Sequence, residues 1–545
     1  MKALLPRGDA AQIGRKRRFV LEVKNNNIKT LLIMSFHSSI GDNEELFSLR
    51  NKLFSELSHF FSSAKLEGVK NCAIKLQEVL PIQSSLEQNK VLVAYGGGKD
   101  SSYMLTFVRL VQLILFKWNG ETFQIRVVTN RHAGMPTSVI ENIHRVYCAL
   151  QLYDDPDVEL LLIDGNKISL FDRYLPLPHN IVSQNRQDIL MTGHRTQASS
   201  RPTFCNACNI SMVNSFGIAS YYDGGVDVII TGDSRKEQRA YMVWVNRLVQ
   251  KISPDLLPSG HGFRDFLKNL DIISQSYFQE IYGDKANHEI EEHRIINNDI
   301  NLDPLFFSIY NYTEYSAGNH WELLTKYLGF EFDELAFSFS ESDCANPALM
   351  AHLRGLKCEH VYGRSYAEGI EEYVKFAISL MRQKQFPEFL IDQITQRYST
   401  AELITLMRKK INDFAFEAFG ITEEQLICMV YAPFSEKGRN LETYLLKEQP
   451  KLLSNLHNIH QVLDRGEKEK TSQQSSDIAS NLYCISGLTL EQLRICYDSP
   501  LLGFNDKNAK LELVNLILER DPHKGIIETR HSPGGPTIYE MISGR

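Results

Sequence analysis

The sequence predicts an α/β protein whose main domain is built on a parallel sheet. Short apolar runs of the kind that form buried strands occur at 90–95, 124–130, 158–164, 188–193 and 226–232. Segments with helical spacing of apolar residues lie between them, most clearly at 100–117, 136–152 and 208–222. Strands that alternate with helices favour crossover connections and a parallel sheet, in which ligands bind beyond the carboxyl ends of the strands.

The rest of the chain predicts a helical extension and two small modules. Residues 261–464 are dominated by helical periodicity, whereas 465–480 is charged, rich in Gln and Ser, and without apolar periodicity, which is typical of a linker. The predicted regions are an N-terminal module (1–88), the α/β domain (89–260), a mostly helical region (261–464), a linker (465–480) and a C-terminal module (481–545).

The composition is that of an ordinary globular protein with more than one domain. Of the 545 residues, 43% are hydrophobic and 23% are charged, and the net charge of −7 gives no global attraction for nucleic acid. No apolar run is long enough to span a membrane, so we expect no membrane partner. Nine cysteines in so long a chain do not indicate a disulfide scaffold, so reduced thiols in a cytoplasmic protein are expected.

A glycine-rich turn joins the first predicted strand to the first predicted helix. The turn and the helix start consist of Gly96, Gly97, Gly98, Lys99, Asp100, Ser101 and Ser102. Glycine lets the backbone approach an anion closely, and the N–H groups and dipole of a helix start attract negative charge. Lys99 adds a full charge, the serines add hydroxyl donors, and Asp100 could cap the helix or bind Mg²⁺. The pattern therefore predicts a phosphate-binding loop.

Other polar residues follow predicted strands and should lie at the same edge of the sheet. They are Asn130, Arg131 and His132, then His194 and Arg195, and finally Gly232 and Asp233. Lys236 comes shortly afterwards and could stabilise phosphate charge, unless this segment is only a solvated helix start. The strand-end histidines are more simply explained as packed or solvated side chains.

The glycine turn resembles the PP-loop of the ATP pyrophosphatase superfamily, whose usual form is Ser-Gly-Gly-x-Asp-Ser. Gly96 stands where that family usually has serine. The spacing fits neither a Walker A loop nor a dinucleotide fingerprint. The resemblance implies a HUP-like nucleotide-binding domain that holds ATP with Mg²⁺, adenylates a substrate oxygen and releases pyrophosphate, after which nitrogen or sulfur displaces AMP. We assign catalytic roles to Lys99, Asp100, Asp233 and Lys236, and nucleotide binding to 96–102, Asn130 and Gly232.

A CxxC motif, Cys205-Asn206-Ala207-Cys208, indicates metal or redox chemistry. Two thiolates at this spacing can bind one zinc ion or one iron–sulfur cluster, or can form a redox disulfide. A closed site needs distant partners, because the chain has no second CxxC. Cys344, which lies in a polar, turn-like stretch, is the best third ligand, and Cys358 or His360 are the alternatives.

The cysteine pattern resembles two groups of PP-loop enzymes. In tRNA 2-thiocytidine synthetase and its relatives, a CxxC in a similar interval and a later cysteine hold an iron–sulfur cluster with one iron open to sulfide. N-acetyl sugar amidotransferases carry a PP-loop, a CxxC and a later Ser-Asp-Cys followed by Asn-Pro, as at 342–347. The resemblance covers roughly 89–400, and it implies that Cys205, Cys208 and Cys344 share one zinc ion or iron–sulfur cluster.

We therefore expect an ATP-dependent enzyme that transfers nitrogen or sulfur to a small molecule, which could be a sugar. No glutaminase-like domain with an N-terminal nucleophilic cysteine is visible, so a partner protein would supply ammonia or sulfur. Two alternatives stay open: a tRNA-thiolating enzyme with an iron–sulfur cluster, for which Arg15 to Arg18 could supply basic contacts, and a nucleotide-binding sensor without turnover. A homodimer is also left open.

Overall fold

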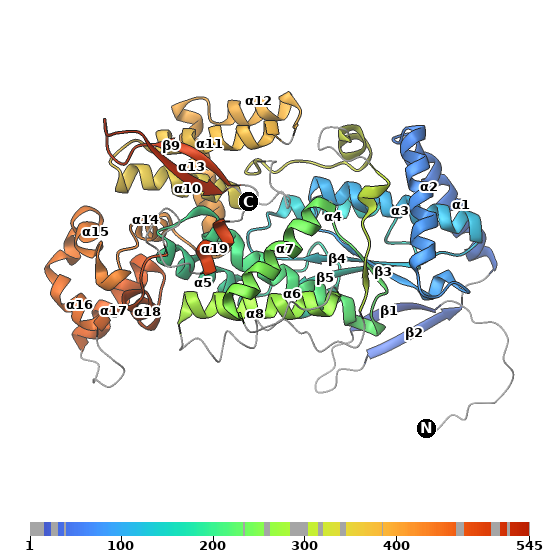
Figure 1. Cartoon of the computed structure of the whole chain (residues 1–545), viewed down its shortest axis with the longest axis horizontal. Coiled ribbons are helices and arrows are strands. Elements are labelled where there is room, and N and C mark those ends of the chain that lie inside the picture. The colour runs from blue at the N-terminus through green and yellow to red at the C-terminus, as the bar shows by residue number, and fades with distance from the viewer. Residues whose placement is uncertain are drawn as a thin grey trace, which may run out of the picture.

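The protein is known from a computed structural model, which describes most of the chain. The described residues are 16–22, 31–37, 40–232, 235–254, 262–283, 303–313, 320–337, 345–383, 385–464, 473–502, 513–519 and 524–543. Within this part of the chain the fold is elongated, with the first helices at one end of the long axis and α15 to α18 at the other (Figure 1). The central sheet lies between the two ends.

The central sheet has six strands in the order β6-β5-β4-β3-β7-β8. The strands are β3 (Lys90–Ala94), β4 (Gln124–Asn130), β5 (Val158–Asp164), β6 (Lys167–Leu170), β7 (Val228–Ile230) and β8 (Leu305–Phe306). All neighbouring pairs are parallel except β5 and β6. This arrangement confirms the prediction of an α/β fold with a mostly parallel sheet.

The order of the strands reverses between β3 and β7. From β3 the chain builds outward to β4 and β5 on one side, and it then returns to place β7 and β8 on the other side of β3. In the register, Val91 of β3 lies between Ile125 of β4 and Val228 of β7. In open α/β sheets a reversal of this kind leaves a crevice at the carboxyl ends of the two strands, where ligands bind.

Alternate residues of β3 belong to two different cores, as the period of a strand requires. Val91 and Val93 join the core cluster that contains α3 (Lys99–Asn119) and α4 (Thr137–Ala149). Leu92 points to the opposite face and joins the cluster that contains α8 (Phe263–Tyr282) and the C-terminal helices. Because both faces are covered, the strand reads as a continuous apolar run.

One predicted strand is wrong. Residues 188–193 lie inside α5 (His179–Thr196), and every residue from 188 to 196 is buried. A helix segment that is buried on all sides lacks the polar face that marks a helix in the sequence. Its short apolar run therefore looks the same as that of a buried strand. His194 and Arg195 therefore do not lie at a strand end. Burial lowers the pKa of His194 to about 4, and the Arg195 guanidinium donates to the backbone carbonyls of α8.

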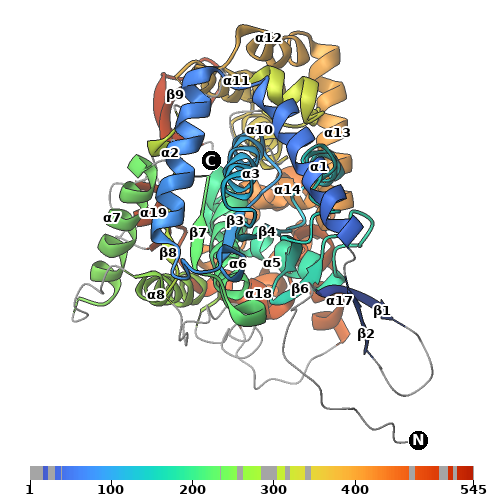
Figure 2. The ribbon, with the colours of Figure 1, turned by 90° about the vertical axis from the view of Figure 1, so that its right-hand side faces the viewer.

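The N-terminal region consists of an antiparallel hairpin and two helices. β1 (Lys16–Glu22) pairs with β2 (Leu31–His37), and α1 (Ile40–Ser58) and α2 (Ser63–Val79) follow. Ser62 ends the connection between the helices, because its hydroxyl accepts a hydrogen bond from the Lys65 N–H at 3.3 Å and caps α2. Both helices contact α3, and Figure 2 shows them on either side of it.

The chain after the sheet is largely helical. α6 (Ala207–Tyr221) and α7 (Arg235–Ile252) precede α8, and the later helices are α10 (Asn346–Leu356), α11 (Tyr366–Gln383), α12 (Glu388–Arg397), α13 (Ala401–Phe419), α14 (Glu423–Tyr431), α15 (Leu441–Glu448), α16 (Leu456–Asp464), α17 (Gln473–Ser486), α18 (Leu490–Asp498) and α19 (Leu513–Glu519). The linker prediction is wrong for 473–480, which form the first half of α17. Ile478, Leu482 and Ile485 bury one face of that helix. Among the described residues, no helix is long and apolar enough to cross a membrane.

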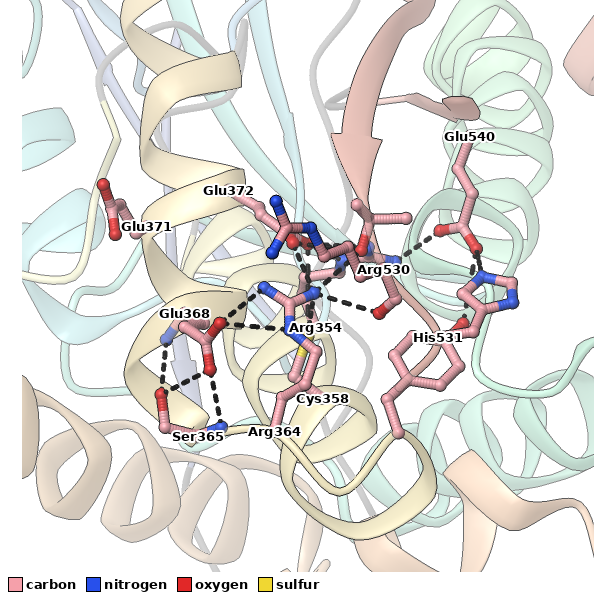
Figure 3. A network of polar contacts seen from close by, with 12 residues as sticks. Arg354, Cys358, Arg364, Ser365, Glu368, Glu371, Glu372, Arg530, His531 and Glu540 are labelled. Atoms are coloured by element: carbon pink, nitrogen blue, oxygen red, sulfur yellow. Dashed lines mark hydrogen bonds and ion pairs between the residues drawn. The ribbon is translucent and has the colours of Figure 1, made fainter. Parts of the chain in front are cut away.

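A C-terminal hairpin docks on the helical region through a network of buried charges. β9 (Lys524–Thr529) pairs with β10 (Ile538–Ser543), and residues 530–537, which include Ser-Pro-Gly-Gly-Pro at 532–536, join them. Arg354 of α10 pairs with Glu372 of α11 at 2.6 Å and with Glu540 of β10 at 2.5 Å. Figure 3 shows these residues in the network. Arg364 makes a second ion pair with Glu372 at 2.7 Å. The hairpin is therefore held by matched charges as well as by apolar contacts.

Candidate functional site

The glycine turn has the strand–turn–helix geometry that the sequence predicts. β3 ends at Ala94 and α3 begins at Lys99, with Gly98 as the N-cap and no side chain capping the first N–H groups. Gly97 has φ +79°, and a Cβ there would lie 2.7 Å from Ile143 and 2.8 Å from Val139, so only glycine fits. Gly96 differs, because no other described residue has an atom within 4 Å of the place its Cβ would take. The turn is thus packed against α4 at Gly97 and unobstructed by described residues at Gly96.

The side chains at the start of α3 contact other groups of the protein. Lys99 is 1% exposed; its Nζ lies 3.6 Å from Asp100 Oδ2 and 5.2 Å from the centre of the Phe386 ring. The hydroxyls of Ser101 and Ser102 both donate to the Gly98 carbonyl, at 3.0 and 2.8 Å. The ammonium of Lys99 and the hydroxyls of Ser101 and Ser102 therefore already have partners within the protein.

Gly232 follows β7 on the other side of the strand reversal. Among the described residues outside its chain neighbours, no atom lies within 4 Å of the place where its Cβ would be, and its carbonyl accepts a hydrogen bond from Tyr310 Oη at 2.8 Å. Gly96 and Gly232 thus follow adjacent strands, and both border open space. Asp233 lies outside the described residues, and so does the side chain of Lys236, whose backbone belongs to α7.

The end of β4 is tied to the glycine turn on one side and to β5 on the other. The Thr129 hydroxyl donates to the Tyr95 carbonyl at 2.7 Å, and Asn130 Oδ1 accepts from Ser215 of α6 at 2.7 Å. Arg131 Nε donates to Asp164 Oδ1 at 2.8 Å, and both side chains are buried. This ion pair fills the part of the edge next to Arg131, whereas the described residues leave free the places that a Cβ on Gly96 or Gly232 would take.

The CxxC motif lies where a π-helical turn, Pro202–Asn206, runs into α6. Cys205 is buried in the core, and Cys208 is partly exposed. Cys344 lies outside the described residues. Asn346, two positions later in the sequence and the first residue of α10, donates from Nδ2 to the Phe204 carbonyl at 3.5 Å. The start of α10 is therefore in contact with the CxxC turn.

The two alternative ligands have other partners. Cys358 Sγ lies 3.8 Å from Arg364 Nη1 within the hairpin network, and burial raises the pKa of its thiol to about 11. His360 Nδ1 lies 2.9 Å from a carboxylate oxygen of Glu448. Within the part of the chain that the structure describes, no three His, Cys, Asp or Glu side chains are grouped to hold a metal.

A pocket joins the CxxC turn to the carboxyl edge of the sheet. It is lined by His132, Asn185, Asp188, Ile189, Thr203, Phe204, Ala207, Cys208, Asn346 and Phe419. Asn185 Oδ1 accepts from the Ala133 N–H at 2.9 Å, and the Asp188 carboxylate accepts from Tyr282 Oη at 2.5 Å. Burial lowers the pKa of His132 to about 4, so its ring is neutral at pH 7. Sequence reasoning missed Asn185, because nothing in its local pattern marks it.

Comparisons with known proteins add no further constraint on this site. No family model, no curated protein and no solved structure matches the chain. The site therefore consists of a helix start and two glycines at a strand reversal, together with a pocket that His132, after β4, and Cys208 of the CxxC motif help to line.

Proposed function

We propose that the protein is an ATP-dependent enzyme of the PP-loop type, which adenylates a substrate oxygen, releases pyrophosphate and transfers nitrogen or sulfur to a small molecule. The observation that supports this best is the position of the glycine turn. It lies at the reversal of strand order, with α3 starting behind it and open space above Gly96 and Gly232. This is the place where open α/β sheets bind nucleotides.

The residues of the turn have distinct tasks in this proposal. The N–H groups at the start of α3 and the close backbone approach at Gly97 bind the phosphates of ATP. Lys99 neutralises charge that develops on the α-phosphate, and Asp100 holds Mg²⁺, which lowers the charge on the leaving pyrophosphate. Asp233 and Lys236 follow β7 in the sequence, and we propose that they act from the opposite side of the crevice.

The second part of the proposal concerns the cysteines. We propose that Cys205, Cys208 and Cys344 hold a zinc ion or an iron–sulfur cluster next to the pocket. Thiolates at CxxC spacing on one turn suit either metal centre. The contact between Asn346 and Phe204 supports the proposal, because it brings the start of α10 against the turn that carries Cys205.

Replacing Lys99 by Met tests the nucleotide site, because Met keeps the apolar stem and removes the charge. We expect ATP affinity, measured by calorimetry, to fall at least about tenfold, a loss of about 1.4 kcal/mol, and pyrophosphate release to stop. Lys326→Met is the matched control, since Lys326 is exposed and its ion-pair partner among the described residues is its helix neighbour Glu322. Unchanged ATP affinity in Lys99→Met would contradict the assignment of the loop.

The reaction type is tested by its products. Phosphorus NMR of the wild-type reaction should show AMP and pyrophosphate, and ADP as the sole nucleotide product would rule out adenylation. ATP that binds at the loop without pyrophosphate release from any acceptor tried would favour the nucleotide sensor instead.

Metal analysis of single variants tests the cysteines. We expect loss of the metal centre, either zinc or iron with its acid-labile sulfide, from each of the variants Cys205→Ser, Cys208→Ser and Cys344→Ser. Cys484 is an exposed cysteine on α17, so the Cys484→Ser control should keep the metal centre. Full metal retention in Cys344→Ser would remove that residue from the site.

A further inference from the structure

A polar atom in the pocket beside the CxxC turn has no hydrogen-bond partner among the residues that the structure describes. Asn346 is 4% exposed, and its Oδ1 accepts no hydrogen bond from any described residue. The other end of the same amide is engaged, because Nδ2 donates to the Phe204 carbonyl. A buried acceptor without a donor costs about 1–3 kcal/mol, so a ligand that donates a hydrogen bond here would be favoured.

A second acceptor lies next to it. A Cβ on Gly134 would lie 2.5 Å from Asn346 Oδ1 and 3.2 Å from His132 Nδ1, so both atoms border the same small volume above this glycine. With its proton on Nε2, the neutral His132 ring presents Nδ1 as an acceptor. The Asp188 carboxylate adds negative charge to the lining.

The size and chemistry of the pocket select the ligand. The interior has room for a water-sized molecule. The Thr203 hydroxyl is not offered to a ligand, because it donates to the Ser199 carbonyl within its own helix at 2.6 Å. The three acceptors Asn346 Oδ1, His132 Nδ1 and Asp188 favour a small species that donates hydrogen bonds, and an imidazole nitrogen is a poor ligand for alkali cations, which prefer oxygen.

We infer that this pocket binds ammonium through Asn346 Oδ1, His132 Nδ1 and Asp188. Ammonium is water-sized, donates four hydrogen bonds, accepts none and carries the charge that complements a carboxylate. The walls come from the α/β domain, from the start of α10 and from the end of α13, so the pocket lies where a nucleophile could reach the sheet edge. Its role as the nitrogen source rests on the proposed function, whereas ammonium binding itself does not.

The His132 ring offers a local readout. The full-length protein, labelled with ¹³C at its histidines, is titrated with ammonium chloride at constant ionic strength without ATP, and the His132 signal is assigned by His132→Gln. We expect a saturable shift of this signal with ammonium chloride and no saturable shift with potassium chloride over the same range. An equal response to potassium identifies a general monovalent-cation site, and no saturable response identifies a water site; either result overturns the inference.

Two variants test which residues make the site. Gly134→Ala places a methyl against Asn346 Oδ1, and Asn346→Leu removes the acceptor; each should weaken ammonium binding at least tenfold. Asn269→Leu is the control, since Asn269 is a buried asparagine of α8 outside the pocket, and it should bind like the parent. Wild-type binding in both pocket variants overturns the inference. If ammonium binds but Lys99→Met leaves ATP affinity unchanged, the ammonium site is supported and only its proposed role as the nitrogen source is lost.

Discussion

The amino and carboxyl edges of the central sheet differ: buried ion pairs that stabilise the fold lie at the amino edge, and the proposed binding site lies at the carboxyl edge. At the amino edge, Arg50 of α1 and Arg109 of α3 converge on Asp155, which precedes β5. Arg50 Nε and Arg109 Nη2 lie 2.9 and 2.8 Å from Asp155 Oδ2, and Arg50 also contacts Asp157 at 2.7 Å. All four side chains are buried. At the carboxyl edge, Gly96 and Gly232 border open space instead, and Asn346 Oδ1 has no described donor.

The direction of α3 explains much of this difference. The helix starts at the carboxyl edge, so its N–H groups and the positive end of its dipole face the ligand side. Its later turns reach the amino edge, where Arg109 and Gln112 are buried. A buried charge is costly unless it is paired, so the amino edge has to carry matched carboxylates. Burial alone would raise the pKa of Asp155, but Arg109 and Arg50 outweigh it and hold that pKa below its usual range.

Asp155→Ala should have the largest effect on stability. It leaves two buried guanidinium groups without their main partner, and breaking a buried pair in this way costs about 3–5 kcal/mol. We expect the free energy of unfolding, measured by urea denaturation, to fall by that amount. Glu331→Ala is the matched control, because Glu331 is 72% exposed in its pair with Arg145 and should cost less than about 1 kcal/mol. Equal losses in the two variants would contradict the assigned role of the amino edge.

The C-terminal hairpin is held by a second set of buried, oppositely charged side chains, and this predicts that the stability of the fold depends on pH. Burial alone would raise the pKa of Glu540, but Arg354 and Lys357 outweigh it and lower that pKa to about 2, from 4.5. A depressed carboxyl pKa stabilises the fold above the unfolded value and loses this contribution as pH falls through the folded value. Stability should therefore decline between pH 4.5 and 2, by roughly 3 kcal/mol for this group.

Glu540→Gln isolates that contribution. In urea denaturation at a series of pH values, the variant should be less stable at pH 6 and should lose less stability than the parent between pH 4.5 and 2. A pH dependence identical to that of the parent would show that Glu540 is not held by the network.

Two neighbouring glycines should separate packing from binding at the carboxyl edge. Gly97→Ala combines a positive φ with a collision against Val139 and Ile143, and we expect it to cost about 1–3 kcal/mol of stability. Gly96→Ala meets no atom within 4 Å and should change stability by less than about 0.5 kcal/mol. Its methyl group would enter the space proposed for phosphate, so ATP affinity should fall. Gly96→Ala that binds ATP like the parent would place the nucleotide elsewhere.

The sequence by itself determined the elements that local pattern controls. β4 and β5 occur at the predicted residues, and α3 begins within one residue of its predicted start, because apolar runs and glycines act over short distances. The same local evidence failed for α5, where burial on all sides removes the helical period. It also failed for 473–480, whose polar composition hid the apolar face of α17.

Only the tertiary structure decided which segments meet. β8 pairs with β7 across more than seventy positions of sequence, and Asn346 reaches the pocket of Cys208 from a helix far along the chain. Glu540 of β10 forms an ion pair with Arg354 of α10, which lies almost two hundred positions earlier in the sequence. These contacts depend on packing between segments that are far apart in the sequence, and the local spacing of apolar residues carries no information about them. The glycine turn and the start of α3, in contrast, depend on backbone geometry that neighbouring residues determine.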